Sequence, residues 1–124
     1  MRRIIFICAS TVMIVAALGT SIPGRSYAAS THRSVKRVTK TVKATTVNGT
    51  FAFKPAKLTI HVGTKVKWTN ASDAPHTVTG KGHWTIKKQL PTGHSVSVIF
   101  TKVGTYHYYC TIHPYMVGTI IVRP

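Results

Sequence analysis

Apolar and polar residues alternate one by one along most of this chain from about residue 47 onward. A strand with one buried side and one solvent-facing side produces this period of two, because successive side chains point to opposite faces. After about residue 28, no stretch of roughly ten residues has the 3.6-residue period of a helix. The pattern therefore predicts an all-β fold, with core positions at Leu58, Ile60, Val62, Val66, Trp68, Val96, Val98, Phe100, Tyr106, Tyr108, Cys110, Ile120 and Val122.

Turn signals divide this alternation into short strands. Gly63-Thr64 and Lys102-Val103-Gly104 separate successive runs, and such signals recur roughly every 8 to 12 residues. Many short strands in a chain of this size predict a two-sheet antiparallel β-sandwich. Residues 71–74 and 80–91 are the least strand-like. We expect loops there, near one end of the sandwich, where functional residues commonly lie.

The N-terminus has the layout of a secretory signal peptide. A basic start precedes an apolar run over residues 4–18, and Ser26 and Ala28 are small residues at a suitable cleavage position. The apolar run is shorter than the roughly 20 residues that a transmembrane helix needs. We expect residues 1–28 to be a signal peptide that is removed on export to the periplasm or the cell exterior. An uncleaved membrane anchor is the alternative.

The rest of the chain is short enough for one domain with a single core. We assign this domain to residues 45–124 and a basic, mobile N-terminal arm to residues 29–44. The basic residues of this arm are interleaved with Ser, Thr and Val, and they are Arg33, Lys36, Arg37, Lys40 and Lys43.

The charge balance is strongly basic. Removing three arginines with the signal peptide lowers the formal charge from +16 to +13, and Asp73 is then the single acidic residue. Such a surface attracts anions, and export argues against nucleic acid as the partner. An acidic protein partner, an anionic membrane or a cell-wall polymer remain as candidates, alongside a surface that is simply solvated. We expect a monomer.

The segment from Cys110 to Met116 carries the chemistry. It contains a thiolate at Cys110, an imidazole at His113 and a thioether at Met116, with two residues between each pair. A turn carrying Pro114 at the end of a strand can bring these donors around one point. Sulfur with imidazole favours copper over hard ions such as magnesium, and thioether ligation is not a zinc pattern. Cys110 is also the one cysteine left after export, where cysteines normally pair.

A trigonal blue copper site needs a second histidine beside the cysteine, the first histidine and a weak axial methionine. His76 is the strongest candidate, because it follows Pro75 and a loop at the start of a predicted strand. His61 and His107 lie on the polar side of alternating strands. The remaining histidines have no matching context, and they are His32, His83 and His94.

Residues 45–123 resemble the cupredoxins, the family of plastocyanins and, above all, amicyanins. Five motifs carry the resemblance, and they are Phe51-Ala52-Phe53-Lys54-Pro55, Gly63-Thr64-Lys65-Val66-Lys67-Trp68-Thr69-Asn70, Pro75-His76-Thr77-Val78, Gly104-Thr105-Tyr106-His107-Tyr108-Tyr109-Cys110, and the C-x2-H-x2-M loop followed by Val117-Gly118. The resemblance implies a Greek-key sandwich that binds one type 1 copper ion cycling between Cu(I) and Cu(II). It makes His76, Cys110 and His113 the equatorial ligands and Met116 the axial one.

Two positions depart from the family pattern. Thr77 stands where relatives usually have an Asn that braces the cysteine loop, and Ile112 stands where they often have Pro. We expect the site to be retained with a shifted potential, because hydrogen bonding around the sulfur is one of the factors that set it.

These features predict an exported one-electron carrier with a redox protein partner. A copper carrier or store that uses the same donors without electron transfer is the alternative. Catalysis is not expected, because the chain has no His-x-His pair for further copper ions and no Cys-x-x-Cys-His for haem.

Overall fold

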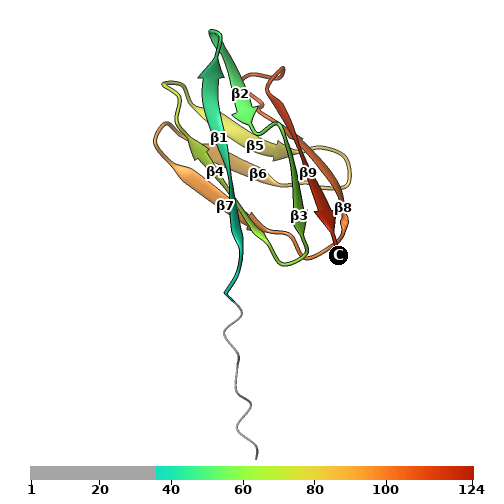
Figure 1. Cartoon of the computed structure of the whole chain (residues 1–124). Helices are drawn as coiled ribbons and strands as arrows, with labels where there is room; N and C mark the ends of the chain where they lie inside the picture. Colours follow the sequence, from blue (N-terminus) through green and yellow to red (C-terminus); the bar gives the residue numbers. More distant parts are fainter. Residues whose placement is uncertain (1–35) are drawn as a thin grey trace, which may run out of the picture. The chain divides into compact units, whose positions relative to one another are not determined.

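The computed structural model describes residues 36–124, which form a two-layered β-structure (Figure 1). The signal peptide predicted for residues 1–28 and the first part of the basic arm lie outside the described residues. From residue 36 onward, no helix is long and apolar enough to cross a membrane. The described strands are β1 (Thr39–Val47), β2 (Thr50–Lys54), β3 (Lys57–His61), β4 (Lys65–Asn70), β5 (His76–Gly80), β6 (Lys87–Leu90), β7 (Ser95–Ile99), β8 (Gly104–Tyr109) and β9 (Val117–Arg123).

The strands form two sheets. The four-stranded sheet has the order β2-β1-β4-β7, and the five-stranded sheet has the order β3-β9-β8-β5-β6. The predicted sandwich is confirmed, but the antiparallel description is incomplete because β1 pairs with β4, and β3 with β9, in parallel. Neither parallel pair joins consecutive strands, and between the two strands of each pair the chain passes through the other sheet.

The core lies between the sheets and follows the predicted alternation. Trp68 of β4 and Tyr108 of β8 are fully buried, and their rings meet edge to face with centroids 5.5 Å apart. Phe53 of β2 packs against Tyr108 at 4.8 Å. Gly63 supplies the predicted turn between β3 and β4 with a φ of +87°, a conformation that costs glycine little. Val62 departs from the prediction, because β3 ends at His61 and the Val62 side chain is exposed.

The expected loop at residues 80–91 is partly wrong. Gly80 ends β5, and residues 87–90 form β6 at the edge of the five-stranded sheet. Along β6 only Leu90 is buried, and the three residues before it are exposed. An edge strand with one buried side chain has almost no alternation, so its sequence gave no strand signal.

The boundary of the basic arm is also wrong. Strand β1 begins at Thr39, so residues 39–44 belong to the folded domain. Val42 and Ala44 are fully buried, whereas Lys40 and Lys43 face solvent. The lysines obscure this short alternating strand, because a run of basic and polar residues favours a mobile segment.

Candidate metal centre

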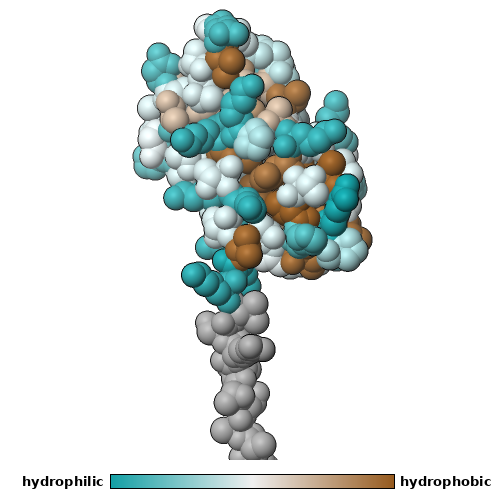
Figure 2. Space-filling view, in the orientation of Figure 1, coloured by the Kyte–Doolittle hydropathy of each residue, from teal (hydrophilic) through white to brown (hydrophobic). Residues whose placement is uncertain are grey.

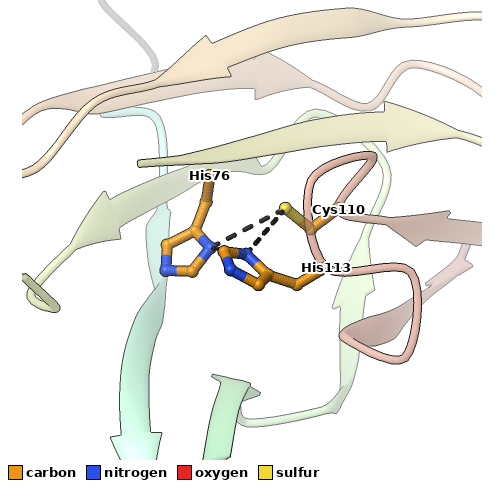
Figure 3. A group of neighbouring side chains, drawn as sticks. All are labelled: His76, Cys110 and His113. Carbon is orange, nitrogen blue, oxygen red and sulfur yellow. Dashed lines mark hydrogen bonds between the residues drawn. The ribbon is translucent and has the colours of Figure 1, made fainter. Parts of the chain in front are cut away.

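Two neighbouring strands bring the candidate donors to one end of the sandwich. His76 is the first residue of β5, and Cys110 directly follows β8. Strands β5 and β8 are antiparallel neighbours, with Thr79 opposite Tyr109. The start of β5 therefore lies at the edge of the sheet where β8 ends. The turn after Cys110 then returns His113 to the same point (Figure 3).

The donor atoms of these three residues form a small triangle. Cys110 Sγ lies 3.7 Å from His76 Nδ1 and 3.8 Å from His113 Nδ1, and the two nitrogens are 3.2 Å apart. A point equidistant from three atoms at these separations lies about 2.1 Å from each of them, within the roughly 2.0–2.3 Å range of metal bonds to imidazole nitrogen and thiolate sulfur. The triangle therefore has the size of a trigonal metal site.

Met116 closes the loop that carries Cys110 and His113. The Met116 N–H donates to the His113 carbonyl at 2.8 Å, and the Cys110 N–H donates to the Met116 carbonyl at 2.9 Å. These backbone bonds hold the segment in a compact turn. The Met116 side chain is 1% exposed, so it belongs to the buried part of this end of the sandwich.

The site is buried except at His113. His76 and Cys110 are completely inaccessible, whereas His113 is half-buried. Burial lowers the pKa of His76, and the neighbouring His113 lowers it further. The carboxylate of Asp73 raises this pKa by a smaller amount. The imidazole of His76 is therefore neutral near pH 7, which is the protonation state that a metal ligand requires.

Thr77 braces the cysteine loop despite replacing the asparagine common in this position. Its Oγ1 accepts a hydrogen bond from the Thr111 N–H at 2.8 Å and lies 3.1 Å from the Thr111 hydroxyl. A third contact joins Thr77 Oγ1 to Thr79 Oγ1 at 3.1 Å. A threonine hydroxyl thus links β5 to the residue after Cys110, and the first departure from the family pattern leaves the loop anchored.

Phe51 is a part of the site that the sequence analysis did not single out. Its ring lies edge-on to His76 with centroids 4.9 Å apart and tilted against His113 at 4.7 Å. It therefore packs against both imidazoles from the start of β2. The signal was present, since Phe51 opens a motif shared with the family, but the motif alone does not indicate a contact with the histidines.

The other histidines do not join this group. Within residues 36–124, the cluster of His76, Cys110 and His113 is the one set of histidine, cysteine and acidic side chains that is close enough to hold a metal ion. His61 and His107 lie on exposed faces of β3 and β8, as predicted, and His83 and His94 are exposed. His32 falls outside the described residues.

Comparison with known proteins decides the family. The sequence profile of the cupredoxin-like domain matches residues 11–122. The chain belongs to the cupredoxin family. The resemblance drawn from the motifs is thereby confirmed.

Individual relatives agree with this cupredoxin assignment. Amicyanin-alpha of Methylorubrum extorquens is 36% identical over 76 residues, which cover 57% of this chain and 64% of that protein. The match therefore spans less than two thirds of the relative's own length. A purple cupredoxin from Nitrosopumilus maritimus superposes with a TM-score of 0.61 at 30% identity. The match covers 67% of this chain and 98% of that one. The Cu(I) form of an amicyanin mutant also has a TM-score of 0.61, at 29% identity over 73% of this chain and 87% of that chain.

Proposed function

We propose that this cupredoxin binds one copper ion as a type 1 site and acts as a one-electron carrier. His76 Nδ1, His113 Nδ1 and Cys110 Sγ would be the equatorial donors, and Met116 the axial one. The observation that carries the proposal is the triangle of donor atoms, with separations of 3.2, 3.7 and 3.8 Å. One thiolate and two imidazoles, with a thioether nearby, are the donors of blue copper sites.

When bound, the copper ion would supply exchange of one electron between Cu(I) and Cu(II). The protein's contribution is to hold the donors still. The Met116 and Cys110 backbone bonds fix the loop, and Thr77 ties that loop to β5. Donors already held at metal-binding separations need little rearrangement between oxidation states, which favours rapid electron exchange.

Burial supports electron transfer over the alternative of a copper carrier or store. A delivery protein needs donors that a receiving molecule can reach. Here His76 and Cys110 are 0% exposed, and His113 alone reaches the surface. The proposed function contains no catalytic step, because the donor set serves one ion whose role is to exchange an electron.

The surface around His113 suits a redox protein partner. Ile112, Tyr115 and Val117 are 49%, 57% and 59% exposed, and Pro114 is exposed beside them. These four residues lie close to His113 in the sequence, and the Tyr115 ring is 6.1 Å from the His113 ring between centroids, so we take them as an apolar rim beside His113. We propose that the partner docks on this rim, because the electron then crosses through the one ligand that reaches the surface.

The lysines would favour an acidic partner. On the face drawn in Figure 2, hydrophilic side chains are interspersed with apolar patches, and most charged residues of the domain are basic. Opposite charges speed association over distances up to the Debye length, roughly 8–10 Å at physiological salt. The rate of electron exchange with an acidic redox protein should therefore fall as salt rises. A rate independent of salt would remove this part of the proposal.

We also propose that the protein is exported to the periplasm or the cell exterior as a monomer. Export rests on the signal-like pattern at residues 1–28. A bound metal would also explain why Cys110 stays unpaired in a compartment where cysteines normally form disulfides.

Voltammetry of the copper-loaded protein tests the central function. An electron carrier gives a reversible one-electron wave and keeps its copper when reduced in the presence of a Cu(I) chelator. Rapid loss of Cu(I) to the chelator would instead favour the copper carrier or store. Absence of any one-electron wave would contradict the electron-carrier proposal.

A further inference from the structure

The nitrogen of His76 that faces away from Cys110 has a buried partner. His76 Nε2 lies 2.7 Å from Ser72 Oγ, four residues earlier in the chain. Ser72 is 7% exposed, and Asn70, the last residue of β4, is 1% exposed. A polar chain therefore leads from Asn70 through Ser72 to the side of His76 opposite the donor triangle.

The orientation of the Asn70 amide is set by its own contacts. Its Nδ2 donates to the Ala74 carbonyl at 2.8 Å and to the Leu90 carbonyl at 2.9 Å. Both amide protons are thus used. Asn70 Oδ1 must then face Ser72, where it accepts from the Ser72 N–H at 2.9 Å and lies 2.8 Å from Ser72 Oγ.

This arrangement determines the direction of the next bond. A hydroxyl has one proton, and both oxygen neighbours of Ser72 Oγ, Asn70 Oδ1 at 2.8 Å and the Ala74 carbonyl at 3.2 Å, are acceptors. If Ser72 donated to His76 instead, two oxygens would face each other at 2.8 Å with no proton between them. The hydroxyl therefore accepts from His76, and the imidazole proton lies on Nε2.

A neutral imidazole has a single N–H. With that proton on Nε2, His76 Nδ1 presents its lone pair toward Cys110 Sγ and His113 Nδ1. We propose that Ser72, oriented by Asn70, is a positioning residue that fixes the tautomer and the ring orientation of His76 so that Nδ1 is ready for the metal. The inference rests on the copper site proposed above, but the tautomer itself is a property of the metal-free protein.

Ser72→Ala removes the bond to His76 together with the contacts of the hydroxyl to Asn70 Oδ1 and Ala74. Other bonds of the loop between β4 and β5 do not use this hydroxyl, among them the Ser72 N–H bond to Asn70 Oδ1. Asn70 holds the loop through the Ala74 and Leu90 carbonyls, and neither bond involves the Ser72 hydroxyl. Ser72→Ala should therefore keep the loop and lose the tautomer control. Removing a hydrogen-bond partner behind a ligand histidine typically weakens metal affinity roughly 10–100-fold.

Thr119→Val is the matched control. Thr119 Oγ1 lies 3.1 Å from Nδ1 of His107, an exposed histidine outside the donor triangle. This variant removes a hydroxyl from a histidine in the same domain, as Ser72→Ala does, but it should leave both the His76 tautomer and the copper affinity unchanged.

The experiment measures nitrogen-15 chemical shifts of the imidazoles in the metal-free protein, at a pH where they are neutral, and then Cu(II) affinity by competition. We expect His76 to be protonated on Nε2 in the wild type and to become a mixture of tautomers in Ser72→Ala, with Cu(II) affinity falling 10–100-fold. A wild-type His76 protonated on Nδ1 would overturn the inference. So would a Ser72→Ala protein with unchanged tautomer and affinity.

The wild-type tautomer remains decisive if Ser72→Ala fails to fold. It also separates this inference from the proposed function. If His76 carries its proton on Nε2 but the wild type forms no blue copper site, the copper proposal fails and the tautomer assignment stands.

Discussion

The Thr77 backbone N–H points at Cys110 Sγ, with the nitrogen 3.3 Å from the sulfur. This bond comes from the residue directly after His76, so one segment of β5 both supplies a candidate ligand and donates to the sulfur of another. A hydrogen bond to a thiolate stabilises its negative charge, and this is one of the factors that set the potential of a blue copper site. The Thr77 side chain acts on the same loop through Thr111.

Thr77→Val tests the side-chain bond while keeping the backbone bond to the sulfur. The Thr111 N–H loses its acceptor at 2.8 Å, and we expect the free energy of unfolding to fall by about 1–2 kcal/mol, with a shift in potential. Denaturant titration and voltammetry measure the two effects. Thr77→Ser retains the hydroxyl and should stay close to wild type. Equal stability and potential in Thr77→Val and wild type would show that the loop needs no brace.

Met116→Leu tests the axial donor. Leu has nearly the volume of Met, so the loss of stability should stay below about 1.5 kcal/mol at this buried position. The thiolate and imidazoles remain, so the blue colour should persist. The potential should rise, because a thioether that helps to stabilise the oxidised ion is gone. An unchanged potential would mean that Met116 does not act on the metal.

His76→Gly should weaken copper binding or open the site to added imidazole, because it removes a buried donor and leaves space in its place. Absorption titration with and without imidazole measures both effects. His94→Gly is the control, since His94 is exposed and lies outside the donor triangle. Blue copper binding of wild-type strength in His76→Gly would exclude His76 as a ligand.

The metal-free protein should lose stability as the pH falls below about 6.5, the ordinary pKa of histidine. Burial and His113 hold the pKa of folded His76 below this value. Below this pH, His76 is protonated in the unfolded chain but still neutral in the folded one. The free energy of unfolding therefore decreases with falling pH until the pKa of folded His76 is passed. Denaturant unfolding across this range measures the effect. His76→Gln should have a flatter profile, and a wild-type profile that rises toward acid would contradict the assignment.

The strands and the donor triangle were predictable to different degrees. Strands with several buried side chains, such as β4 and β9, stand out by alternation. Strand β6 does not, because Leu90 is its single buried residue. The cysteine loop was recognisable because Cys110, His113 and Met116 are close in sequence. His76 was then predicted because a blue copper site needs a second histidine, which this loop does not contain.

The supporting contacts could not be predicted from the sequence. Thr77 meets Thr111 and Phe51 meets His113 through pairings of residues far apart in the chain. Such contacts depend on the register of strands and on how the sheets pack, which local patterns do not encode. The contact of Ser72 with His76 is local, yet its direction depends on the carbonyl of Leu90, which lies in another strand.

The absorption spectrum of the purified, reduced protein with one equivalent of Cu(II) tests the central claim most directly. If His76, Cys110 and His113 meet at one ion, the wild type should turn intensely blue, because that charge-transfer band requires a copper–thiolate bond. Cys110→Ser should fold and stay colourless. A colourless wild type, or a Cys110→Ser protein as blue as the wild type, would contradict the account.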